Sequence, residues 1–195
     1  MSQPPIPPLA ALNAQNQQEL QSAKMAYRKI RRAIGMAQFD GWTIGIIAGF
    51  SFLFGVVCGD WVSTVIGMAL VINAWIELQS AQRLRQLDPQ AIRRMGLNQL
   101  AVAGVIVLYV GWTIALILFG KDELASVSSA SAQAGIDPGQ IRMLEVGVYL
   151  IVLAIGLAST LGMSRYYFTR EKYLKAYLEQ TPAWIIAMQR SGMMF

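Results

Sequence analysis

Hydrophobic positions along the chain gather into four long segments, and polar stretches separate these segments from one another. The segments cover residues 40–58, 61–79, 97–119 and 143–163. A helix that crosses a membrane needs about 20 mostly apolar residues, because each residue advances it by about 1.5 Å through a hydrocarbon layer of about 30 Å. Each segment is about long enough, and we therefore predict an all-α integral membrane protein with four transmembrane helices.

Turn signals arrange the four segments as two hairpins. Only Gly59 and Asp60 separate the first segment from the second, so that the glycine can reverse the backbone and Asp60 can cap the next helix. Asp-Pro pairs at 88–89 and 137–138 have the chemistry of a helix start, an N-cap carboxylate before a proline in the first turn. We therefore expect the third and fourth helices to begin at these pairs, ahead of their apolar parts.

Amphipathic patterns flank this four-helix domain, which covers residues 40–163. Residues 16–39 carry apolar side chains at three- and four-residue steps among many basic ones, which predicts a basic amphipathic helix. Residues 164–195 are expected to form a second amphipathic helix and an apolar tail, and the proline-rich residues 1–15 an extended, flexible tail. The pattern leaves two alternatives for the first helix, contact with the membrane surface or packing on the protein's own cytoplasmic face.

Lysine and arginine are distributed unevenly around the four segments. They are frequent before the first segment, between the second and third, and after the fourth, whereas the Gly59-Asp60 turn has none and the loop 120–142 has only Lys121 and Arg142. Because basic residues are enriched in cytoplasmic loops, we predict that both termini are cytoplasmic. The compact loops and the absence of an Asn-x-Ser/Thr glycosylation sequence favour a bacterial cytoplasmic membrane among the cell membranes.

The basic residues beside the segments are expected to contact anionic lipid at the membrane surface. Those at the N-terminal side are Lys24, Arg28, Lys29, Arg31 and Arg32, and those at the C-terminal side are Arg170, Lys172 and Lys175. The net charge of +5 is therefore assigned to membrane topology, and no nucleic-acid partner is expected.

Composition excludes most catalytic and metal-binding chemistry. The 195-residue chain has no histidine, which is the commonest general base and metal ligand. Its single cysteine, Cys58, allows neither an internal disulfide nor a cluster of thiolate ligands. We therefore predict a protein without enzymatic activity, without a metal site and without a cofactor.

Ionisable residues inside apolar segments often mark a functional site. Glu77 is the best candidate here, and Asn73 lies one turn away on the same helix face. The pair could bind a cation or a proton, or form hydrogen bonds between helices. The interpretation that we favour is that Glu77 lies near the cytoplasmic interface and pairs with Arg83 or Arg94. No carboxylate falls in the middle of a segment, which argues against a proton-coupled carrier.

Small residues recur at four-residue spacing in the apolar segments, and such stripes let helix backbones approach closely in lipid. We expect them to pack within the four-helix bundle, with contact to another subunit as the alternative. The residues are Gly45, Gly49, Gly55, Gly59, Gly67, Gly111, Ala154, Ala158 and Gly162.

These patterns together favour a scaffold or an accessory subunit of a membrane assembly. Its partners would be the lipid bilayer and either other membrane-protein subunits or further copies of itself. The alternative is a small oligomeric channel or transporter with Asn73 and Glu77 near its inner mouth. An enzyme that acts on lipid is disfavoured, because histidine and Asp-rich metal motifs are both missing.

Overall fold

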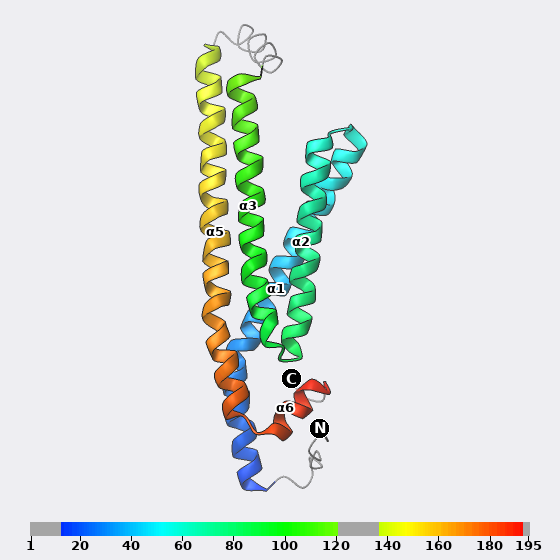
Figure 1. The fold of residues 1–195 in the computed structure, drawn as a ribbon, viewed down its shortest axis with the longest axis vertical. Helices are drawn as coiled ribbons and strands as arrows, with labels where there is room; N and C mark the ends of the chain where they lie inside the picture. The colour runs from blue at the N-terminus through cyan, green and yellow to red at the C-terminus, as the bar shows by residue number, and fades with distance from the viewer. Residues whose placement is uncertain (1–12, 121–136, 193–195) are drawn as a thin grey trace. The chain divides into compact units, whose positions relative to one another are not determined.

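The computed structural model describes residues 13–120 and 137–192, and within these residues it contains α-helices and no strand (Figure 1). The helices are α1 (Ala14–Cys58), α2 (Trp61–Arg85), α3 (Pro89–Phe119), α5 (Pro138–Gln180) and α6 (Ala183–Arg190). Four of them, α1, α2, α3 and α5, are long and apolar enough to cross a membrane. The prediction of an all-helical chain with four candidate spans is confirmed. Most of the predicted N-terminal tail, the polar loop after α3 and the last three residues lie outside the described residues.

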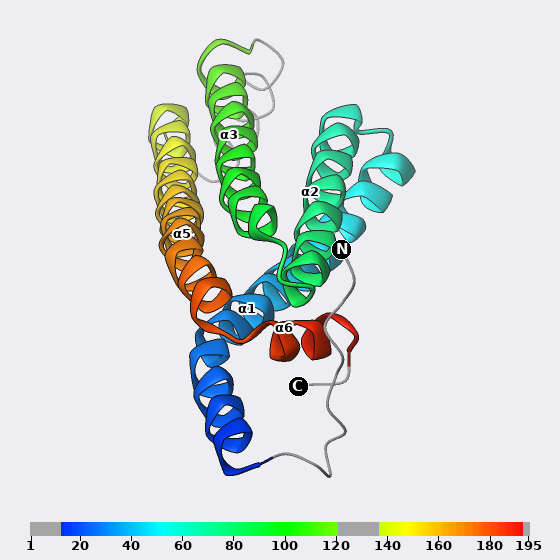
Figure 2. The ribbon, with the colours of Figure 1, turned by 60° about the horizontal axis from the view of Figure 1, so that its bottom comes forward.

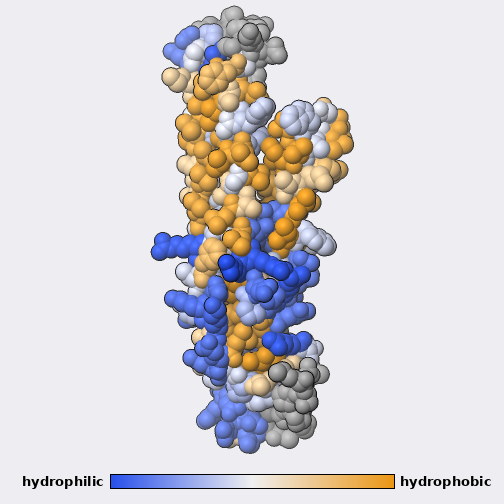
Figure 3. All heavy atoms as spheres, in the orientation of Figure 1, coloured by the Kyte–Doolittle hydropathy of each residue, from blue (hydrophilic) through white to orange (hydrophobic). Residues whose placement is uncertain are grey.

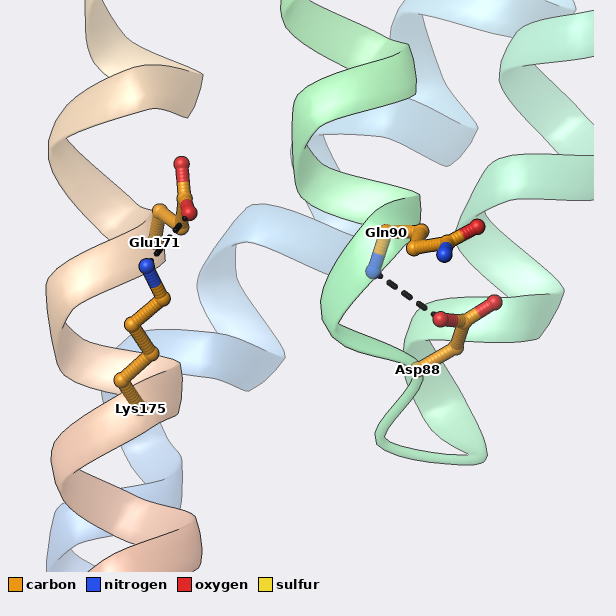
Figure 4. A network of polar contacts seen from close by, with 4 residues as sticks. All are labelled: Asp88, Gln90, Glu171 and Lys175. Carbon is orange, nitrogen blue, oxygen red and sulfur yellow. Dashed lines mark hydrogen bonds and ion pairs between the residues drawn. The ribbon is translucent and has the colours of Figure 1, made fainter.

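Aspartate side chains cap the starts of three helices, as the turn signals predict. At α2, the Asp60 carboxylate accepts a hydrogen bond from the backbone N–H of Val62 at 3.0 Å. At α3, Asp88 accepts one from Gln90 at 2.9 Å (Figure 4). At α5, Asp137 accepts one from the N–H two residues further on, at 3.3 Å. These bonds satisfy N–H groups that have no partner within the first turn of a helix.

The turn between α1 and α2 depends on Gly59. Its backbone is left-handed, with φ of 71°, a conformation that glycine adopts at little cost. The Gly59 N–H bonds to the carbonyl of Val56 at 3.4 Å, and the Asp60 N–H bonds to that of Gly55 at 2.9 Å. These bonds close the last turn of α1 and reverse the chain directly into α2.

α1 is a single helix of 45 residues, whereas the sequence divides it into an amphipathic helix at 16–39 and an apolar segment at 40–58. At about 1.5 Å per residue it is roughly twice as long as the hydrocarbon layer is thick, so part of it must lie outside that layer. The apolar positions of its first half, among them Ala23, Tyr27 and Ile30, are buried within the protein. This face of the helix therefore packs on the protein itself, and contact of the same helix with the membrane surface, which is compatible with that packing, stays a prediction.

The buried core joins parts of the five helices that carry polar and basic residues on their outer faces. It brings together the first half of α1, the end of α2, the start of α3, the second half of α5, and α6, which lies beside α1 (Figure 2). Its residues are Ala23, Tyr27, Ile30, Ala33, Ile34, Ala37, Ala81, Leu84, Leu87, Ala91, Ile92, Met95, Tyr167, Leu174, Tyr177 and Ile185. All of them lie in one of the two compact units of the chain, which runs to Asn98 and resumes at Met163.

The apolar segments pack far less. In the most apolar 18-residue stretch of each candidate span, only 17%, 22%, 22% and 6% of the residues are buried, for α1, α2, α3 and α5 in turn. Large hydrophobic side chains such as Leu108 and Phe119 are exposed along these stretches, and Figure 3 shows the hydrophobic surface that they form. Apolar surface of this extent is expected to meet lipid or another protein.

Glycines bring α1 and α2 into close contact. A Cβ atom at Gly67 of α2 would lie 2.6 Å from the backbone nitrogen of Phe52 in α1. A Cβ atom at Gly55 of α1 would lie 2.7 Å from the backbone nitrogen of Thr64 in α2. Real Cβ atoms do not approach other atoms so closely, so these two positions require glycine.

Candidate functional site

A polar cluster is buried where α2 faces the start of α3. The Asn98 side-chain amide donates a hydrogen bond to the backbone carbonyl of Asn73 at 3.1 Å, and the Asn73 amide donates one to the carbonyl of Asn98 at 3.4 Å. The Asn98 amide also donates to Glu77 Oε2 at 2.9 Å. Two spans are thus joined by a reciprocal amide pair that also holds a carboxylate, which is the kind of contact that fixes helix register in lipid.

Helix α5 completes this polar cluster. The Tyr167 side chain is fully buried, and its hydroxyl is close enough to the Glu77 carboxylate for the two to act on each other electrostatically. One turn earlier in α5, the Ser164 hydroxyl donates to the backbone carbonyl of Gly96 at 3.0 Å. Glu77 itself is only 1% exposed, so its carboxylate is held by α3 and α5 side chains away from solvent.

The sequence identified part of this cluster. Asn73 and Glu77 do lie together on one buried face of α2, but Asn98, Ser164 and Tyr167 were not predicted as partners. Asn98 could have been found, because a carboxamide at the start of an apolar segment is as unusual as the one at Asn73. The sequence analysis favoured Arg83 or Arg94 as the partner of Glu77, and that pairing stays a prediction beside the hydrogen bond from Asn98.

The chemistry of the cluster is limited to holding or exchanging a proton, or binding one small cation. Among the described residues, it contains the Glu77 carboxylate with amide and hydroxyl groups around it, and the Asp40 carboxylate is close enough to Tyr167 to act on its hydroxyl electrostatically. Within residues 13–120 and 137–192, no group of three or more Asp, Glu, His or Cys side chains is placed to hold a metal ion.

The predicted small-residue stripes fall into two groups. Gly55 and Gly67 lie within the close contact of α1 with α2, and Gly45 lies against Ala74. A Cβ atom at Gly49, Gly59, Gly111 or Gly162 would meet no atom within 4 Å among the described residues, and Ala154 and Ala158 are exposed. The structure thus places the first group at an internal contact and leaves the second on the surface.

Several of the predicted lipid-contacting residues lie against tyrosines of the same chain. Lys29 of α1 lies 4.3 Å from the centre of the Tyr173 ring in α5, and Lys172 lies 5.3 Å from that centre. Arg170 lies 4.5 Å from the centre of the Tyr166 ring. Such contacts between a cation and an aromatic face contribute about 0.5–2 kcal/mol each.

The remaining predicted lipid contacts are distributed over the outer surface. Lys175 forms an ion pair of 2.8 Å with Glu171 (Figure 4). Lys24, Arg28, Arg31 and Arg32 are exposed along α1. Contact with lipid therefore stays a prediction for this group.

Comparisons of the chain with protein-family models, with curated proteins and with solved structures gave no significant match. The function must therefore be inferred from the residues and their arrangement.

Proposed function

We propose that this protein is a non-enzymatic multi-pass membrane protein that acts as a scaffold or accessory subunit of a membrane assembly. The observation that supports this most directly is the low burial of the four candidate spans, from 6% to 22% in their most apolar stretches. A channel or enzyme that worked as a single chain would need spans packed around its site. Spans that leave most of their surface open are suited to contact with other spans.

The open small-residue positions support the same proposal. Helices in lipid associate through close backbone contact at Gly and Ala, because burying apolar side chains gives little gain there. Gly111 on α3 and Ala158 on α5 are exposed positions of this kind. We infer that the partner is either a different membrane subunit or another copy of this chain.

The orientation is part of the proposal. Both termini and the buried core would lie in the cytoplasm of a bacterial cell, with the Gly59-Asp60 turn on the opposite side of the membrane. The support comes from the clustering of lysine and arginine on the helix ends that form the core. Labelling of single cysteines from either side of intact cells would test it, with Cys58 and an introduced Ser191→Cys expected on opposite sides.

The test of the assembly is the native mass of the tagged protein after gentle extraction from its own membrane. A defined larger species is expected. Gly111→Leu should reduce the fraction in that species by roughly tenfold, because a bulky side chain blocks close backbone approach. Val107→Leu, also exposed and one turn earlier on α3, should leave the species unchanged. A lone monomer without a copurifying chain would overturn the proposal.

A small oligomeric channel or transporter is the second candidate, and the buried Glu77 carboxylate favours it. A carboxylate enclosed by amides and a tyrosine within a candidate span has the chemistry of a cation or proton site. Flux of protons or monovalent cations into liposomes that Glu77→Gln abolishes would support this candidate. Absence of flux from liposomes containing the native assembly would exclude it.

A further inference from the structure

A cavity of about 460 Å³ opens among α1, the end of α2 and the C-terminal helix α6. All three elements belong to the same compact unit. The cavity lies beside the buried core, since Tyr27 and Ile34 of that core form part of its wall. It is separate from the polar cluster around Glu77, which shares none of its lining residues.

Two arginines from different helices line this cavity, Arg31 of α1 and Arg85 of α2. Both guanidinium groups are close enough to the Tyr27 hydroxyl to act on it electrostatically. Arg85 donates a hydrogen bond to the neutral Gln38 amide oxygen at 2.9 Å. Among the described residues, the wall of the cavity includes no carboxylate side chain and neither arginine forms an ion pair.

Gln189 supplies an independent observation that points to a ligand. This side chain lies on the cavity wall, yet it is only 7% exposed. Its Oε1 atom accepts a hydrogen bond from the Tyr177 hydroxyl at 2.7 Å, which fixes the amide. Its Nε2 atom, a donor, has no hydrogen-bond partner among residues 13–120 and 137–192. Buried donors are almost always paired, so an acceptor is expected at this place.

Two guanidinium groups that form no ion pair among the described residues, together with the Gln189 amide donor that has no hydrogen-bond partner there, suit the same kind of ligand, an anion rich in acceptor oxygens. Phosphate groups fit best, because arginine binds their oxygens through paired N–H donors and each oxygen accepts several hydrogen bonds. We propose that this cavity binds a phosphate group through Arg31, Arg85 and Gln189 Nε2. The phosphate would come either from the headgroup of an anionic lipid or from a soluble phosphate compound.

The experiment uses the full-length protein purified in a neutral detergent and titrated with inorganic phosphate by calorimetry. A parallel titration uses the protein in phosphatidylcholine nanodiscs to which phosphatidylglycerol is added. Arg31→Gln and Arg85→Gln should each weaken binding by about tenfold or more, since hydrogen bonds to charged groups are among the strongest. Arg32→Gln on α1 and Arg94→Gln on α3 remove the same charge outside the cavity and should change binding less than twofold.

Arg31 and Arg85 are both exposed, so their substitution should not disturb folding, and circular dichroism checks this. Gln189→Glu is the second test: it places a carboxylate beside the two arginines and should abolish binding. Phosphate binding with this pattern identifies a site for a soluble phosphate. Binding of phosphatidylglycerol alone, with the same pattern, identifies a lipid headgroup site. The proposal would be overturned if the protein bound neither phosphate nor phosphatidylglycerol, or if Arg31→Gln and Arg32→Gln weakened binding equally.

This test is independent of the proposed assembly. The phosphate site depends on residues of one chain, whereas the assembly depends on exposed spans. A monomer that binds phosphate would contradict the proposed function and leave this inference intact.

Discussion

The buried core and the apolar segments differ in how burial relates to hydrophobicity, and the relation is the reverse of that in a soluble protein, where the most hydrophobic segments are the most buried. In the core, Leu84, Leu87 and Ile92 have no exposed surface. In the apolar segments, Leu108 and Phe119 are 75% and 80% exposed although the sequence around them is far more hydrophobic. The most hydrophobic parts of the chain are thus the least packed.

The difference follows from the solvent of each region. Burial of apolar side chains is favourable where the alternative is water, and contributes about 25 cal/mol for each Å² removed. Between helices in lipid that gain is absent, because lipid tails are as apolar as leucine. The helix ends, which lie in water, therefore bury their apolar side chains in a core. The spans can remain in contact with lipid, and they associate only with a protein surface that fits them closely.

Removing volume from the core should produce the largest effect. Leu84→Ala should lower the free energy of unfolding by about 2–5 kcal/mol, because it leaves a cavity at a fully buried position. Leu108→Ala makes the same chemical change at an exposed position and should shift stability by less than about 0.5 kcal/mol. Denaturant titration in detergent micelles, followed by circular dichroism, measures both. Equal effects would mean that the spans are as closely packed as the core.

Adding volume between α1 and α2 should produce the next largest effect. Gly67→Ala would force a methyl group to within 2.6 Å of the Phe52 backbone, and such overpacking costs about 1–3 kcal/mol. Gly49→Ala, where a Cβ atom meets open space, is the matched control. Heat denaturation of the two variants in the same detergent compares them. A stable Gly67→Ala protein would show that the two helices can separate without loss.

The polar cluster gives a smaller effect. Asn98→Leu removes the donor at 2.9 Å from Glu77 and should cost about 1–2 kcal/mol, since a buried acceptor then loses a partner. If the two side chains stabilise each other, Glu77→Leu together with Asn98→Leu should cost less than the sum of the single changes. Additive losses in this double-mutant cycle would show that the bond contributes nothing.

The smallest effect is expected at the turn before α2. Hydrogen bonds from Ser63 hold the pKa of the Asp60 carboxyl below its ordinary value of 3.8, and the bond from the hydroxyl has a larger effect than the bond from the backbone N–H. Ionised Asp60 therefore stabilises the folded state above that pH, and this contribution is lost as the pH falls through the lowered pKa. Asp60→Asn should remove this part of the acid dependence, whereas Glu179→Gln should not. The measurement is the melting temperature of the wild type and of Asp60→Asn from pH 6 to pH 2, and the same dependence on pH in both proteins would contradict this role of Asp60.

Local features of the structure could be predicted from the sequence. Helix starts at Asp60, Asp88 and Asp137 depend on a carboxylate and the backbone two residues later. The lengths of the candidate spans depend only on consecutive apolar residues. The continuity of α1 was missed, because a change from basic to apolar composition at residue 40 resembles a boundary while the backbone needs none there.

The sequence by itself determined the all-helical class, the four candidate spans and the lack of histidine as a base or ligand, since these depend on composition and on neighbours a few residues apart. Only the tertiary structure decided which polar groups meet. Glu77 contacts Asn98 and Tyr167, and Arg31 shares a cavity with Arg85 and Gln189, across separations that no periodicity records. Such pairs arise only when helices pack against one another, because the register and rotation of each helix are set by side-chain fit along the whole contact.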